Sequence, residues 1–199
     1  MRSIVAPTER DWIAVKRIFR YLKGSIDFGI LYRGGKANFI AFSDADYGMC
    51  EETKRSTSGV VSMIGTGAVT WSSRRQQSVA LSTMEAELMA ASEAAKDVVW
   101  IRRVLGEIDA GKLKYKPTLF VDNMGTISLI NNPVFHRRSK HIEIRQYFVR
   151  ERCEEGIMVV SHVASEQQVA DIMTKPLARV AFELLRGEMG FISLTETGK

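Results

Sequence analysis

The spacing of apolar residues predicts one helix, one short strand and three longer strands in the first 75 positions. Apolar side chains recur at helical spacing after Thr8, a suitable helix cap, and this pattern ends at Lys23-Gly24. Short apolar runs then predict strands at 28–32, 37–42, 58–65 and 68–73. Only Thr66-Gly67 separates the last two strands, and so short a connection favours an antiparallel hairpin.

The remainder of the chain alternates helices with strands. Ser82-Thr83-Met84-Glu85 matches a capping box and opens a long helix that runs to about Asp109. A second capping box at Ser165 predicts another helix, which meets Lys175-Pro176. The other expected elements are strands at 117–122 and 157–163 and helices at 123–130, 142–154 and 179–189. Three antiparallel strands followed by two strands that alternate with helices are typical of a mixed α/β fold, in which binding sites collect at the carboxyl ends of central strands.

The length of 199 residues suits one sizeable core with an added segment. We expect residues 1–36 to form an appendage of a helix and a short strand, residues 37–178 the main domain, and residues 179–199 a terminal helix and tail. An apolar content of 45% and a charged content of 26% are ordinary for a soluble globular protein. No apolar run approaches the length of a membrane span and no signal peptide opens the chain, so we expect a soluble intracellular protein.

The net charge of +5 comes with clusters of basic residues, such as His136-Arg137-Arg138-Ser139-Lys140-His141. A polyanionic partner is one interpretation, and a solvated basic face is the usual alternative. Cys50 and Cys153 lack the spacing of a zinc site. We therefore expect two free thiols in a reducing compartment.

A candidate functional carboxylate follows the strand at 37–42. This strand is almost wholly apolar, which is typical of a strand buried on both faces, and it leads into Asp44 and Asp46. Burying a lone carboxylate costs free energy unless a cation or hydrogen-bond donors stabilise it. Asp44 is therefore expected to have such a partner or a functional role. The alternative, an acid in a surface turn, is more plausible for Asp46 than for Asp44.

The long helix carries a second candidate. Glu87 heads a stripe of small residues that must pack on the sheet, formed by Ala91, Ala94, Ala95 and Val98. An acid at the top of such a stripe points over the edge of the sheet, which favours a functional role. Glu85 occupies the third helical position and is placed to reach back to the helix cap.

Three further polar residues lie at or near the ends of predicted elements. Asp122 follows a strand and precedes a helix, so a helix cap and a functional carboxylate are equally good interpretations. Asp171 lies near the second turn of its predicted helix, too deep to serve the helix dipole, which favours function. His162, at the end of the last predicted strand, is a candidate accessory base or proton shuttle.

At these residues the sequence resembles the ribonuclease H domain of copia-type retrotransposon polyproteins. Residues 12–24 resemble the linker that joins the reverse transcriptase to this domain. Six motifs in the family's order, with a resemblance from about residue 8 to residue 190, make the match specific. The motifs are Ser43-Asp44-Ala45-Asp46-Tyr47, Arg55-Ser56-Thr57-Ser58-Gly59, Ser82-Thr83-Met84-Glu85-Ala86-Glu87, Val121-Asp122-Asn123, Ser139-Lys140-His141-Ile142-Glu143-Ile144-Arg145 and Ala170-Asp171-Ile172-Met173-Thr174-Lys175-Pro176-Leu177.

The resemblance implies a ribonuclease H-like fold, with a five-stranded mixed sheet of three antiparallel and then two parallel strands, flanked by helices. It also implies a catalytic and metal-binding set of four carboxylates, which match Asp44, Glu87, Asp122 and Asp171. Four converging carboxylates repel one another without cations, and hard oxygen ligands suit two Mg²⁺ ions, for which Mn²⁺ can substitute. The implied reaction is hydrolysis of the RNA strand of an RNA/DNA hybrid by a two-metal mechanism.

The sequence departs from the family's pattern at three places. Tyr47 stands where the family usually has Trp, Gln146-Tyr147 replaces a more usual Tyr-His pair, and the stretch after Gly48 lacks the customary Gly-Asp. These departures affect packing and the grip on substrate, and they leave the four carboxylates in place.

Candidate nucleic-acid contacts are Ser82, Asn123, Arg137, Arg138 and Lys140. Helix N-termini favour anions, so Ser82 and Asn123 could contact phosphate or sugar, although simple helix capping explains them equally well. The basic residues are candidate phosphate contacts, each of which steepens salt dependence. The implied partners are the hybrid and the reverse transcriptase domain of the same polyprotein, with no membrane. The implied location is a cytoplasmic virus-like particle or the nucleus.

Three functions agree with these residues. The first is an active metal-dependent ribonuclease H. The second is a catalytically silent or domesticated ribonuclease H-like module that binds nucleic acid or protein. The third is a nuclease of the same broad fold that acts on other substrates, such as DNA junctions.

Overall fold

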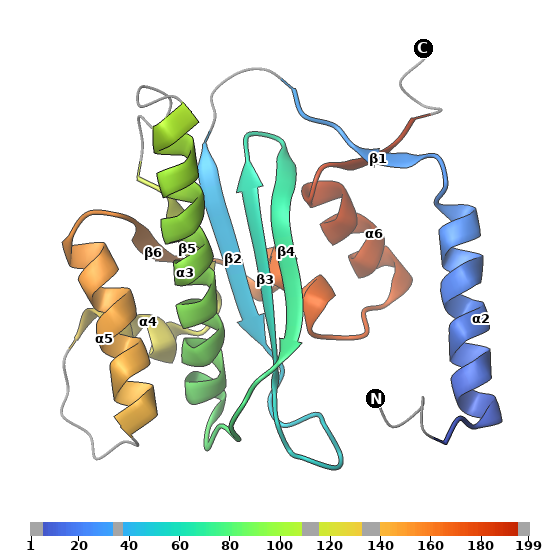
Figure 1. The fold of residues 1–199 in the computed structure, drawn as a ribbon, viewed down its shortest axis with the longest axis horizontal. Helices are drawn as coiled ribbons and strands as arrows, with labels where there is room; N and C mark the ends of the chain where they lie inside the picture. Colours follow the sequence, from blue (N-terminus) through green and yellow to red (C-terminus); the bar gives the residue numbers. More distant parts are fainter. Residues whose placement is uncertain (1–5, 34–37, 109–115, 133–139, 195–199) are drawn as a thin grey trace.

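The structure is a computed structural model that describes residues 6–33, 38–108, 116–132 and 140–194. Its centre is a five-stranded sheet in the order β4-β3-β2-β5-β6 (Figure 1). β2, β3 and β4 are antiparallel to one another, whereas β5 runs parallel to both β2 and β6. The predicted mixed sheet is thus confirmed. The strands are β2 (Phe39–Ala45), β3 (Thr57–Ile64), β4 (Gly67–Arg75), β5 (Thr118–Val121) and β6 (Val159–His162).

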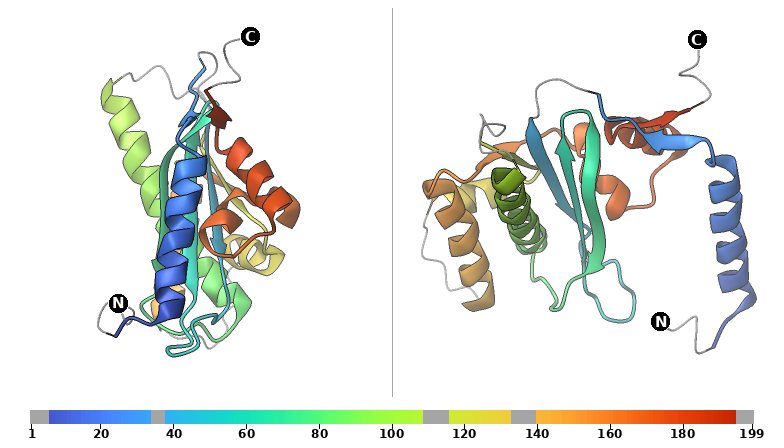
Figure 2. Two further views of the ribbon diagram at one scale, coloured as in Figure 1. Left: turned by 90° about the vertical axis from the view of Figure 1, so that its right-hand side faces the viewer. Right: turned by 45° about the horizontal axis from the view of Figure 1, so that its top comes forward.

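Helices cover both faces of this sheet and give the protein two apolar cores. On one face, α3 (Thr83–Ile108) packs on β2 and β3, with α5 (Lys140–Glu154) against α3, and α4 (Met124–Asn131) completes the layer. The other face is covered by the 3-10 helix η2 (Val169–Met173) and by α6 (Arg179–Glu188) (Figure 2). Alternate residues of β2 enter the two cores, since Ala41 belongs to the first and Phe42 to the second.

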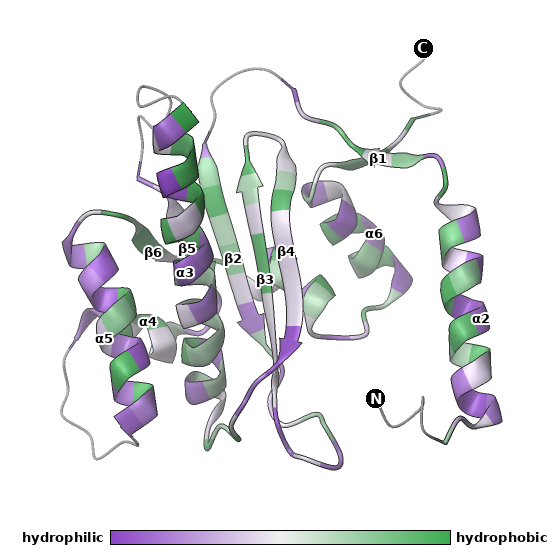
Figure 3. Cartoon of the chain, in the orientation of Figure 1, coloured by the Kyte–Doolittle hydropathy of each residue, from purple (hydrophilic) through white to green (hydrophobic). Residues whose placement is uncertain are grey.

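Two terminal segments pair outside the main sheet. α2 (Glu9–Gly24) leads into β1 (Phe28–Ile30), which forms an antiparallel two-stranded sheet with β7 (Phe191–Ser193). α2 has no buried residue, and Figure 3 shows apolar and polar residues along it. Thr8 is the helix cap, as predicted, and it forms a capping box in which Thr8 and Asp11 exchange side-chain and backbone hydrogen bonds.

The prediction of a helix after Ser165 is wrong. The chain forms two short 3-10 helices there, η1 (Ser165–Gln167) and η2, with Gln168 between them. The side chain of Gln168 is fully buried, donates to the carbonyl oxygen of Ser43 at 3.0 Å and accepts from the N–H of Ala170 at 3.3 Å. Gln168 therefore separates the two turns, and Asp171 lies in the first turn of η2 rather than the second turn of an α-helix.

The other predicted helices and strands are present with small shifts in their ends. β2 extends to Ala45, so Asp44 lies within the end of the strand and Asp46 follows it. β7 was not expected from the sequence. Cys50 and Cys153 are free cysteines, as predicted. Within the described ranges, no helix has the length and apolar character needed to cross a lipid bilayer.

Candidate metal centre

Asp44 is buried at the carboxyl end of the central strand. It is the penultimate residue of β2, its solvent exposure is 0%, and it lies opposite Gly59 of the neighbouring strand β3. The hydroxyl of Thr174 donates a hydrogen bond to Oδ2 of Asp44, and the ammonium of Lys175 lies 3.1 Å from Oδ1. The buried carboxylate thus has the donors that its burial requires.

Glu87 reaches the same place from the other side of the sheet. It lies in the first turns of α3, a few residues after Ser82. The hydroxyl of Ser82 caps this helix by accepting a hydrogen bond from the N–H of Glu85 at 3.2 Å. Glu85 in turn accepts from the N–H of Leu81 at 2.8 Å, which is the capping role expected for it. Oε1 of Glu87 accepts from the N–H of Ala45 at 3.3 Å, and Oε2 is buried with no hydrogen-bond partner. An unpartnered buried carboxylate oxygen requires a proton or a cation.

Asp122 follows β5 directly and completes a group of three acids. One ligand atom from each of Asp44, Glu87 and Asp122 lies within 4.8 Å of the other two. We call these residues the carboxylate triad. The helix-cap interpretation of Asp122 is wrong, because Asn123 is the N-cap of α4 and accepts from the N–H of Thr126 at 2.9 Å. Asp122 instead accepts a hydrogen bond from the hydroxyl of Ser165 at 3.1 Å.

Asp171 lies beside the triad and is joined to Asp44 by a lysine. The Nζ atom of Lys175 is 2.8 Å from Oδ1 of Asp171 and 3.1 Å from Oδ1 of Asp44. The N–H of Lys175 donates to the carbonyl oxygen of Asp171 at 3.0 Å, which fixes the turn that carries both side chains. Lys175 and Thr174 are contacts of the site that sequence reasoning did not assign, although both lie in a quoted motif.

Gly59 allows η2 to approach the sheet closely enough to bring Asp171 to Asp44. A Cβ atom at residue 59 would lie 2.7 Å from Cγ2 of Thr174 and 2.8 Å from the carbonyl oxygen of Ala170. Real Cβ atoms essentially never come this close to another atom. The glycine therefore sets the spacing between β3 and η2.

The acids perturb one another's protonation. Burial raises the pKa of Glu87 to about 9, and the negative charges of Asp44 and Asp122 add to this effect. Burial also raises the pKa of Asp171 to about 6, although its hydrogen bond to Lys175 opposes the change. Burial alone would lower the pKa of Lys175, but Asp171 and Asp44 outweigh it and raise the pKa. Such perturbed groups at the end of a central strand are typical of functional sites.

The donor set fits a hard divalent cation. The triad offers only carboxylate oxygens, the ligands that Mg²⁺ and Mn²⁺ prefer, and it includes the unpartnered Oε2 of Glu87. A cation beside Glu87 would replace the proton that burial otherwise favours there. The geometry thus supplies one cation site from three elements that are distant in the chain.

Among the other predicted residues that the structure describes, two are helix caps and two are exposed at the ends of elements. Asn123 and Ser82 both act as helix caps in the structure, Lys140 is the exposed first residue of α5, and His162 is exposed at the end of β6, paired with Val121. Arg137 and Arg138 lie outside the described residues. The surface-turn interpretation of Asp46 is wrong in one respect: it is 5% exposed, and its Oδ1 accepts from the N–H of Met49 at 3.4 Å in the turn after β2.

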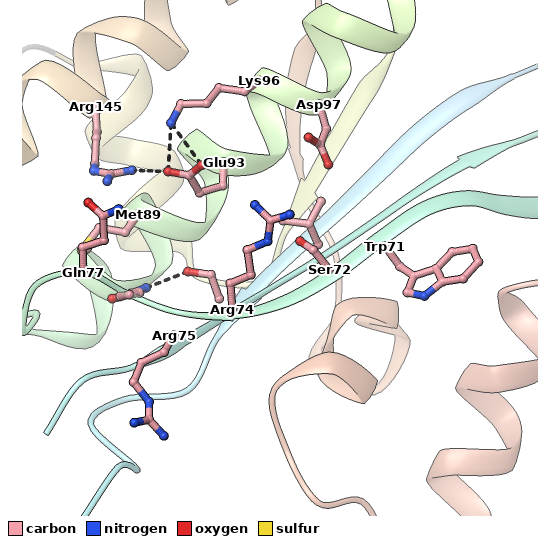
Figure 4. Close-up of a pocket in the computed structure, with 13 residues that line it drawn as sticks. Trp71, Ser72, Arg74, Arg75, Gln77, Met89, Glu93, Lys96, Asp97 and Arg145 are labelled. Carbon is pink, nitrogen blue, oxygen red and sulfur yellow. Dashed lines mark hydrogen bonds and ion pairs between the residues drawn. The ribbon is translucent and has the colours of Figure 1, made fainter. Parts of the chain in front are cut away.

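A separate pocket of about 340 Å³ lies beside the edge strand β4 (Figure 4). Arg74 and Arg75, at the end of β4, line it together with residues of α3 and with Arg145 of α5. Inside it, Glu93 already holds Lys96 at 3.0 Å and Arg145 at 2.8 Å. Its lining also includes Ser58 and Val60 of β3, but none of the three triad residues.

Comparisons with solved structures agree on the fold. The RNase H1 called LC11, isolated from compost, matches with a TM-score of 0.51 and 16% identity, over 69% of this chain and 93% of that one. The N-terminal RNase H domain of rv2228c from Mycobacterium tuberculosis matches with a TM-score of 0.50 and 11% identity, over 76% of this chain and 97% of that one. The five-stranded mixed sheet described above is therefore ribonuclease H-like.

Comparisons with curated sequences identify relatives along nearly the whole chain, whereas no family model matches. The Pol polyprotein of transposon RE2 from Arabidopsis thaliana is 38% identical over 189 residues, which is 94% of this chain. The Pol polyprotein of transposon TNT 1-94 from Nicotiana tabacum is 32% identical over 192 residues, or 96% of the chain. This chain spans only 13% and 14% of those polyproteins. With its ribonuclease H-like fold, the chain belongs to the family of copia-type retrotransposon Pol polyproteins.

Proposed function

We propose that this chain is a metal-dependent endonuclease of the ribonuclease H type, which hydrolyses the RNA strand of an RNA/DNA hybrid. The observation that carries the proposal is the convergence of Asp44, Glu87 and Asp122 from three elements, with an unpartnered oxygen of Glu87 among them. Membership of a retrotransposon Pol family supports the choice of substrate, because reverse transcription pairs RNA with newly made DNA.

The residues that would hold the cations are the four carboxylates. Asp44, Glu87 and Asp122 would bind one ion, and Asp44 and Asp171 would bind a second, with Mg²⁺ or its substitute Mn²⁺ as the expected metal. When bound, such a pair of ions activates water and stabilises the charge on the leaving oxygen. The expected products carry a 3′-hydroxyl and a 5′-phosphate.

Neighbouring groups hold the carboxylates in position. Ser165 donates to Asp122, Thr174 donates to Asp44, and the N–H of Ala45 donates to Glu87. On Glu87 and Asp122 the donor occupies one carboxylate oxygen and leaves the other free to bind a cation, as expected of outer-shell partners, whereas Oδ1 of Asp44 also contacts Lys175. Glu87 must release the proton that its raised pKa of about 9 retains at neutral pH before it can act as a ligand.

Substrate contacts would come from the rim around this centre. We assign Ser82, Asn123 and Lys140, together with Arg137 and Arg138, to contacts with phosphate or sugar, in addition to the capping roles of the first two. A hybrid is recognised by its shape and by 2′-hydroxyls on one strand only. The reverse transcriptase domain of the same polyprotein is the expected partner, in a cytoplasmic virus-like particle.

The test is a cleavage assay with three proteins. Wild type, Asp44→Asn and Asp46→Asn are each given a labelled RNA/DNA hybrid, RNA duplex, DNA duplex and branched DNA, with Mg²⁺, Mn²⁺ or chelator. We expect wild type to cut only the RNA of the hybrid, and only with metal. Asp44→Asn should lose far more than the roughly 10- to 100-fold that a supporting residue costs, with unchanged folding and hybrid binding. Asp46→Asn, which keeps its turn acceptor, should cut normally.

The alternative functions give different outcomes in this assay. Hybrid binding without any cleavage would indicate a silent binding module. Cleavage of branched DNA alone would indicate a nuclease with another substrate. Cleavage by Asp44→Asn at the wild-type rate would remove Asp44 from the catalytic set.

A further inference from the structure

A lysine ammonium occupies the space between two of the four carboxylates. The Nζ atom of Lys175 contacts Oδ1 of both Asp44 and Asp171, at 3.1 Å and 2.8 Å. The Asp44 side chain is 1% exposed and that of Asp171 is 13% exposed, so this pair of acids is largely withdrawn from water. Two such acids are strongly stabilised by a cation between them.

The carboxylate triad lacks a comparable contact at its other two members. Glu87 accepts a hydrogen bond from the N–H of Ala45, and Asp122 accepts one from the hydroxyl of Ser165. Both of these donors are neutral. The four acids thus form two unequal sites that share Asp44: a pair with a cation between its two members, and a triad whose other two members have only neutral donors in the contacts above.

We infer that the Lys175 ammonium is a built-in cation of this centre and occupies the space between Asp44 and Asp171. One divalent ion then binds at the triad, and a second ion must displace the ammonium. The inference deepens the proposed function and rests on its metal site. Mg²⁺ needs oxygen ligands at about 2.0–2.1 Å, and an ammonium within 3.1 Å of both oxygens leaves no room for it.

Displacement of the lysine is physically feasible. Its side chain is 36% exposed, and its four-carbon stem is flexible, so the ammonium can turn out to solvent while the backbone of η2 stays in place. Lys175 therefore competes with the second ion and does not exclude it. Its role is that of a positioning residue, which holds Asp44 and Asp171 together until that ion binds.

The test counts bound ions in the full chain without nucleic acid. Free Mn²⁺ is measured by electron paramagnetic resonance during a titration of wild type, Lys175→Met, Lys175→Gln and Lys175→Arg. We expect wild type and Lys175→Arg to bind one ion at concentrations at which Lys175→Met and Lys175→Gln bind two. The second ion should bind at least about tenfold more tightly to the neutral variants. Lys96→Met, which changes a lysine paired with Glu93 on the surface of α3, should match wild type.

Two further variants locate the second ion. Asp171→Asn combined with Lys175→Met removes one ligand of the pair and should return the count to one. Thermal melting with chelator establishes whether each variant is folded. If Lys175→Met does not fold, Lys175→Gln, which keeps a hydrogen-bond donor, is the neutral variant in which the ions are counted. The inference is overturned if wild type binds two ions as tightly as the neutral variants, or if a folded neutral variant binds one. Absence of cleavage with these counts intact would contradict the proposed function alone.

Discussion

The substitution Gly59→Ala tests how the fold positions the site. Its new methyl group would lie 2.7 Å from Cγ2 of Thr174, 2.8 Å from Cβ of Met173 and 2.8 Å from the carbonyl oxygen of Ala170. The last of these is a backbone atom, which cannot rotate away. To restore ordinary contact with that oxygen at 3.4 Å, η2 must move away from β3 by about 0.6 Å.

The expected loss of stability follows from that displacement. Overpacking of a core costs about 1–3 kcal/mol, and 1 kcal/mol lowers Tm by about 2–4 °C in a chain of this size. We therefore expect Gly59→Ala to melt roughly 2–12 °C below wild type. The same movement separates Asp171 from Asp44 by more than the ~0.2 Å that metal sites tolerate, so binding at this pair should weaken.

The assays are thermal denaturation followed by circular dichroism, with chelator, and Mn²⁺ binding. Gly106→Ala is the matched control, because a Cβ on this α3 glycine meets nothing within 4 Å and alanine favours a helix by about 0.5–1 kcal/mol. It should raise Tm and leave metal binding unchanged. If Gly59→Ala melts at or above the wild-type temperature, the reasoning about close packing is refuted.

Two further predictions concern single side chains. Because the pKa of Glu87 is raised from 4.5 to about 9, the folded chain retains a proton that the unfolded chain releases, and stability without metal should fall as pH rises between these values. The Tm of Glu87→Gln relative to that of wild type should therefore rise progressively from pH 5 to pH 9. A difference in Tm that stays constant over this range would contradict the raised pKa of Glu87. Buried Arg150 donates to the carbonyl oxygens of Ile130 at 2.8 Å and Leu129 at 3.1 Å at the end of α4, so Arg150→Leu should cost about 1–3 kcal/mol in urea denaturation. Arg179→Leu, at an exposed ion pair, should cost only about 0.3–0.5 kcal/mol, and equal losses would argue against the buried role.

Local patterns predicted most elements of the fold because those elements carry their own signals. The capped start of α3 and the short turn between β3 and β4 depend on residues close together in the chain, and both lie where expected. The placement of Asp44 at the end of a buried strand followed from its apolar neighbours. The family motifs then suggested which acids belong together.

The features that sequence reasoning missed depend on contacts between distant residues. Gln168 ends one turn and begins the next because its buried side chain binds β2, 125 positions away, and no local pattern reveals this. The bridge from Lys175 to Asp44 spans 131 positions. Gly59 lay within a quoted motif, but its role appears only when η2 is placed against it.

The pairing of β1 with β7 has a consequence for anyone who shortens this protein. Predicted boundaries at residues 36 and 178 assign the two strands to different segments, yet Phe28 faces Ser193 and Ile30 faces Phe191 in one ladder. Trimming either end strips the backbone partners from the other and exposes an unpaired edge that invites aggregation. A soluble fragment should therefore retain both ends or lose both together.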